Sequence, residues 1–154
     1  MRFLSSLFNR NKIDCPRCLG KGDVDLQDIK RLKKELHWLP GKCAYCNGEG
    51  KVSSKKVSMV SVDIEYLTTD LPKGERKKLL NGDIGALQRA KAYEAGVNKF
   101  INQIEHQYYI ENQEAEQIAD YLFRKYPRLG NSSTERRETI DYIEKVIKSK
   151  LSNK

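Results

Sequence analysis

The sequence predicts a mainly α-helical protein, in which a small cysteine-containing module of two β-hairpin knuckles with an inserted helix is followed by an antiparallel helical bundle. Three observations predict this fold. A ten-residue pattern occurs twice in the first third of the chain, an amphipathic stretch separates the two copies, and apolar residues further along recur at spacings of three and four. We therefore divide the chain into an N-terminal segment (1–12), the module (13–56) and a helical domain (57–154).

The repeated pattern is C-x-x-C-x-G-x-G-x-V, and its two copies contain all four cysteines of the protein. Two residues between paired cysteines let both sulfurs of one tight turn point the same way, and glycines permit backbone angles that side chains would block. Two such turns supply four thiolates for one tetrahedral Zn²⁺. The predicted ligands are Cys15, Cys18, Cys43 and Cys46. The predicted turn residues are Gly20, Gly22, Gly48 and Gly50.

Other uses of the cysteines stay open at this point. Disulfides suit an oxidising compartment, but residues 1–8 are too short for the apolar region of a secretory signal, so we expect a cytoplasmic protein with reduced thiols. The same residues would instead pack under the module or form a short amphipathic anchor. A redox pair usually has one C-x-x-C rather than two matched copies, and rubredoxin-like iron is a further alternative to zinc.

The C-x-x-C-x-G-x-G repeat over residues 13–53 resembles the cysteine-rich zinc-binding region of DnaJ-type co-chaperones, in which repeats pair to form zinc modules beside a polypeptide-binding domain. The resemblance implies zinc ligation by the four cysteines, turn formation by the four glycines, and binding of a polypeptide client. This chain has two repeats where that family has four, enough for one zinc site, and it lacks the His-Pro-Asp signature of the J-domain.

The insertion at residues 26–38 predicts a helix that Asp25 caps and Pro40-Gly41 terminates. Its apolar face would contain Leu26, Ile29, Leu32, Leu36 and Leu39. Its other face would carry a candidate partner-binding surface of Lys30, Arg31, Lys33, Lys34 and Trp38. Charged faces of amphipathic helices are often simply solvated, and Trp38 would alternatively anchor the helix by packing.

The rest of the chain predicts helices, although Val57 to Val62 fits either a strand or the start of a helix. Asp83 can cap one helix, Asn112 can open another, and residues 132–135 fit a capping box. We expect these helices to bury a shared core as an antiparallel bundle. The predicted helices cover about 74–80, 83–108, 112–126 and 132–151.

Composition restricts the function classes. The net charge of +8 is concentrated in residues 1–60, which carry 13 Lys or Arg against 6 Asp or Glu, and a basic excess favours acidic partners. No apolar run approaches the roughly 18 residues of a membrane span, so we expect none. The two histidines lie in no catalytic motif and no phosphate-binding loop is present, so we expect a protein that is not an enzyme.

Three functions compete. The first is a zinc-binding, non-catalytic protein–protein interaction adaptor or accessory chaperone, whose partner is a protein or an unfolded polypeptide. The second is nucleic-acid binding through the basic helix at 26–38, which predicts an affinity that falls steeply with salt. The third is thiol–disulfide exchange through the C-x-x-C pairs, which requires accessible thiols.

Overall fold

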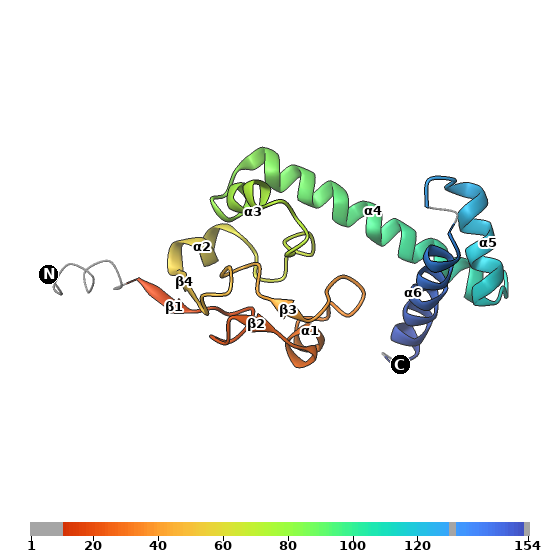
Figure 1. The fold of residues 1–154 in the computed structure, drawn as a ribbon, viewed down its shortest axis with the longest axis horizontal. Coiled ribbons are helices and arrows are strands. Elements are labelled where there is room, and N and C mark those ends of the chain that lie inside the picture. Colours follow the sequence, from red (N-terminus) through yellow and green to blue (C-terminus); the bar gives the residue numbers. More distant parts are fainter. Residues whose placement is uncertain (1–10, 130–131, 153–154) are drawn as a thin grey trace, which may run out of the picture. The chain divides into compact units, whose positions relative to one another are not determined.

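The computed structural model describes residues 11–129 and 132–152, and they form a mainly α-helical fold, as predicted (Figure 1). They divide into two compact units, the first ending at Glu94 and the second beginning at Ala95. The prediction for residues 1–8 lies outside the described residues. No described helix has the length and apolar character needed to cross a membrane.

The first unit contains four short strands arranged around the two cysteine turns. The strands are β1 (Lys12–Asp14), β2 (Asp23–Val24), β3 (Gly41–Lys42) and β4 (Lys51–Ser53). β1 pairs with β4 and β2 pairs with β3, both antiparallel, with Ile13 opposite Val52 and Val24 opposite Gly41. Each pair therefore joins a strand that enters one cysteine turn to the strand that leaves the other. The two sequence repeats hold each other in place rather than forming two independent hairpins.

The helix of the insertion, α1, covers only Leu26–Arg31, so the predicted helix over 26–38 is too long. Its start is as predicted, because the side chains of Asp25 and Asp28 form a capping box. It ends in a Schellman motif, in which the Lys34 amide donates to the Ile29 carbonyl (2.9 Å) and Lys33 takes a φ of 55°. A glycine normally occupies that left-handed position, so lysine gives no sequence signal for the stop.

The predicted apolar face is only partly buried. Ile29 is buried, but Leu26 is 71% exposed and Leu39 is 80% exposed. Residues 32–40 continue as turns and irregular chain rather than as a helix, so helical spacing no longer places Leu36 and Leu39 on the same side as Ile29.

Three further helices complete the first unit: α2 (Ser54–Met59), α3 (Lys73–Leu80) and the start of α4 (Ile84–Tyr109). The ambiguous stretch 57–62 is thus the end of a helix followed by irregular chain. Apolar residues from 60 to 90 share one core with the cysteines, Tyr45 and Trp38. Residues 57–94, assigned to the helical domain from sequence, pack on the cysteine module in this structure.

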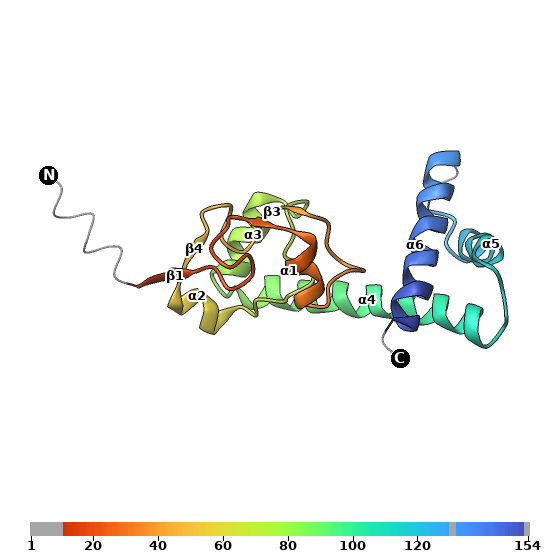
Figure 2. The same cartoon turned by 90° about the horizontal axis from the view of Figure 1, so that it is seen from below.

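The second unit contains the end of α4 with α5 (Ala115–Lys125) and α6 (Ser133–Leu151). Helices α5 and α6 pack side by side (Figure 2). Glu114 rather than Asn112 precedes α5, whereas the predicted capping box at the start of α6 is present. The Tyr126 hydroxyl donates to Gln103 (2.8 Å). The buried core consists of Ile101, Ile104, Ile118, Ala119, Leu122, Ile143, Val146 and Ile147.

Candidate metal centre

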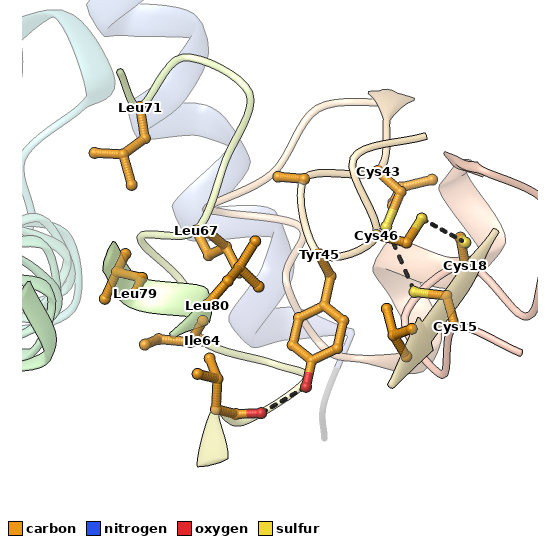
Figure 3. Packing of buried hydrophobic residues seen from close by; sticks show 14 of the residues in the cluster. Cys15, Cys18, Cys43, Tyr45, Cys46, Ile64, Leu67, Leu71, Leu79 and Leu80 are labelled. Atoms are coloured by element: carbon orange, nitrogen blue, oxygen red, sulfur yellow. Dashed lines mark hydrogen bonds between the residues drawn. The ribbon is translucent and has the colours of Figure 1, made fainter. Parts of the chain in front are cut away.

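The four cysteines of the two repeats meet at one buried point (Figure 3). All four sulfur atoms lie within 4.8 Å of one another. The sulfurs of Cys15 and Cys43 are 3.8 Å apart, and those of Cys18 and Cys46 are also 3.8 Å apart. Each close pair therefore takes one sulfur from each repeat.

These spacings fit a tetrahedral metal ion. Four sulfurs that each lie about 2.3 Å from a central ion are about 3.8 Å from one another in a regular tetrahedron. A disulfide would instead require about 2.05 Å between sulfurs, and the four cysteines are free thiols. The donor set suits Zn²⁺ or iron, and it leaves no ligand position for water.

Backbone amides support the sulfurs in the same way in both repeats. The Gly22 amide donates to the Cys18 sulfur (3.2 Å), and the Gly50 amide donates to the Cys46 sulfur (3.2 Å). Leu19 and Asn47, at equivalent positions, take matching φ values of 52° and 56°. Donors aimed at a sulfur stabilise its thiolate, as metal binding requires.

The backbones of the two cysteine turns lie in close contact at their glycines. All four have positive φ values, as the predicted turns require. A Cβ at Gly50 would lie 2.3 Å from the Gly20 carbonyl oxygen, and one at Gly22 would lie 2.7 Å from that of Gly48. These glycines therefore let the two turns approach closely enough for their cysteines to share one ion.

We expect Gly50→Ala to destabilise the first unit by about 2–4 kcal/mol, because it adds backbone strain and a clash with backbone that cannot swing away. Gly74→Ala is the matched control, since a Cβ there has open space within α3. It should be neutral or slightly stabilising. Urea denaturation of the metal-loaded proteins measures both free energies of unfolding. Equal stabilities of the two variants would contradict the claim that the close contact between the turns requires glycine at position 50.

Arg17 lies between the two cysteines of the first turn and is the most extensively bonded buried side chain of the site, with 2% exposure. Its guanidinium donates from Nε to the Val62 carbonyl (2.9 Å), from Nη1 to that of Leu67 (2.6 Å) and from Nη2 to that of Ile64 (3.2 Å). It also lies 4.1 Å from the centre of the Trp38 ring. Arg17 thereby connects the first cysteine turn to residues 62–67.

Arg17 also supplies positive charge beside the thiolates. Burial lowers its pKa to about 10, while the nearby Cys43 and Cys15 oppose that shift. Four thiolates around a divalent ion have a net charge of −2, so a buried cation next to them reduces the cost of burying the cluster.

The pKa values of the Cys15, Cys18 and Cys43 thiols differ because the sulfur atoms are buried and lie close to one another. A hydrogen bond with Cys43 lowers the pKa of Cys15 to about 5, and the same bond raises the pKa of Cys43. Burial raises the pKa of Cys18 to about 11. Without an ion, one thiolate is favoured at the expense of its neighbours, whereas a metal stabilises all four and displaces their protons.

The structure does not bring the predicted partner-binding residues to one open surface. Trp38 is 6% exposed and its indole N–H donates to the Glu65 carbonyl (2.9 Å), so it is a packing anchor. Lys34 contacts the Glu65 carboxylate (3.1 Å), and Arg31 donates to the Arg17 carbonyl (2.7 Å). Lys30 and Lys33 are exposed.

Two residues that help to build the site, Arg17 and Tyr45, could not be recognised from the sequence pattern. Arg17 occupies one of the variable positions between paired cysteines, and its acceptors lie 45 to 50 residues away. Tyr45 occupies the corresponding turn of the second repeat, where its hydroxyl donates to the Val60 carbonyl (2.6 Å). Figure 3 shows this ring between the cysteines and the apolar residues Ile64, Leu67, Leu79 and Leu80.

Comparison of the chain with protein-family models, with curated proteins and with solved structures found no match.

Proposed function

We propose that the protein is a zinc-binding, non-catalytic adaptor or accessory chaperone that binds a polypeptide partner in a reducing compartment such as the cytoplasm. The observation that carries the proposal is the cluster of four buried thiols at tetrahedral spacing. A closed set of four sulfurs stabilises structure rather than activating water, so the ion would position surfaces for a partner.

Burial of the sulfurs argues against thiol–disulfide exchange. Cys15, Cys18 and Cys43 are 0% exposed and Cys46 is 4% exposed. Exchange requires a thiolate that a second disulfide can reach, and none of the four offers that access in this arrangement. The engagement of Lys34 and Arg31 with neighbouring groups weakens the proposal that the insertion binds nucleic acid.

Two measurements on the 154-residue chain test the proposed function. Elemental analysis after purification without chelators should find about one zinc per chain. The zinc-loaded protein should also slow the aggregation of a chemically unfolded globular protein, and a single-stranded DNA oligonucleotide should not compete. Displacement of the unfolded chain by DNA, or no effect on aggregation, would contradict polypeptide binding.

A further inference from the structure

A cavity of about 410 Å³ lies beside the second cysteine turn, within the first unit. One wall is the turn itself from Ala44 to Glu49, a second is β4 with the start of α2, and the third is α3. Tyr45, Val52 and Leu80 give the cavity an apolar floor, since all three are buried.

The residues that line this cavity are strongly basic. They include five lysines and one arginine but only one acidic residue, Glu49. Two of the lysines already have acidic partners, because Lys12 lies 3.6 Å from Glu49 and Lys51 pairs with Asp14. The other four cations form no ion pair with any residue of the described chain: Lys56, Lys73, Arg76 and Lys77.

Arg76 is the one arginine among the described residues that line this cavity. Its Nε atom is buried and has no hydrogen-bond partner among residues 11–129 and 132–152. A buried donor without an acceptor costs about 1–3 kcal/mol. A carboxylate in the cavity would be a natural partner for the Arg76 guanidinium group, because its two oxygens match the planar fork of that group.

We propose that this cavity binds an acidic segment of a partner polypeptide, with an apolar side chain on the floor and carboxylates at Arg76 and the surrounding lysines. The inference rests on the proposed polypeptide-binding function and identifies the class of partner. The chain's own residues 1–10 cannot supply the charge, because they include Arg2 and Arg10 but no acidic residue.

The floor favours a peptide over a nucleic acid. Proteins that bind single strands usually offer exposed aromatic rings on which bases stack. Tyr45 is the one aromatic residue among the described lining residues, and it is 1% exposed with its hydroxyl donating to Val60. The floor can thus contact an aliphatic side chain but presents no ring face for a base.

The cavity is also coupled to the metal centre, because Cys46 lies in the turn that forms its first wall. Loss of the ion should therefore abolish peptide binding even though no cation of the cavity is a metal ligand. Peptide affinity and metal content should fall together during titration with a chelator.

The test uses the zinc-loaded 154-residue chain and three probes. These are a short peptide of leucines flanked by Asp and Glu, its Asn and Gln analogue, and a single-stranded DNA oligonucleotide. Calorimetry should show binding of the acidic peptide and at least about tenfold weaker binding of the amide analogue, the loss expected for two or three charge pairs.

The double variant Lys73→Gln, Lys77→Gln should bind the acidic peptide about tenfold more weakly, as should Arg76→Gln. The double variant removes two exposed charges of α3 and so preserves the test if Arg76→Gln fails to fold. The matched control is Arg137→Gln, Lys145→Gln, which removes two exposed charges of α6. It should bind like the unmodified protein.

The outcomes separate this inference from the proposed function. If an unfolded polypeptide still binds but the acidic peptide does not, or if the cavity variants bind it normally, the cavity assignment is wrong and the adaptor function stands. If DNA binds in place of peptide and the same variants lose that binding, both proposals are wrong.

Discussion

Removal of the metal is expected to unfold the first unit while the helices of the second unit remain. The four strands of the first unit are two or three residues long and α1 and α2 have six residues each, so they are too short to be stable alone. A structural zinc contributes roughly 10 kcal/mol or more, comparable to the whole stability of a small domain. The expected loss extends to residue 94, because residues 60–90 share the core of the cysteines.

Cys43→Ser should have the same effect as a chelator. Hydrogen exchange should show loss of protection up to about residue 94, with continued protection in α5 and α6. Leu19→Asn is the matched control: it copies Asn47 of the other repeat, and Asn tolerates the positive φ of this exposed position. If protection is lost in both units together, the second unit does not remain folded without the first, and the prediction is wrong.

Replacement of Arg17 by methionine is expected to cost about 3–5 kcal/mol, the range for loss of one partner from a buried charged network. Three carbonyl groups, two of them in buried hydrogen bonds, would lose their donor, and the cysteine cluster would lose its neighbouring cation. Arg17→Lys should cost less but remain destabilising, because an ammonium keeps the charge without the planar fork that reaches all three carbonyls.

The matched control for Arg17 is Arg89→Gln. Arg89 pairs with Glu75 on the surface of the same unit, where such pairs contribute about 0–1 kcal/mol. Urea denaturation of the zinc-loaded proteins gives the stabilities, and competition with a chelator gives the metal affinity. Arg17→Met should weaken metal binding as well as stability. If it does neither, Arg17 does not couple the metal turn to residues 62–67.

The features that the sequence predicts well are local ones. Cysteine spacing and alternate glycines predict that the four cysteines meet at one point, because the geometry of each cysteine turn is contained in about eight consecutive residues. The capping box at Ser132 places the start of α6 for the same reason. Strand pairing between the repeats is non-local, so the pattern of each repeat alone does not reveal that β1 pairs with β4.

Two other features required the structure because their causes lie outside the local pattern. The end of α1 depends on Lys33 adopting a left-handed conformation, which residue type does not favour. The stacking of Arg17 on Trp38 joins the first cysteine turn to the end of the insertion and buries a tryptophan that could otherwise contact a partner. The basic cavity likewise combines residues from Lys12 to Asn81.

X-ray absorption spectroscopy of the protein as isolated tests the central claim most directly, since it identifies both the metal and its ligand atoms. The account predicts zinc with four sulfur neighbours at about 2.3 Å. A spectrum with nitrogen or oxygen among the nearest neighbours, or a sample without stoichiometric metal, would contradict a zinc ion held by the two cysteine turns.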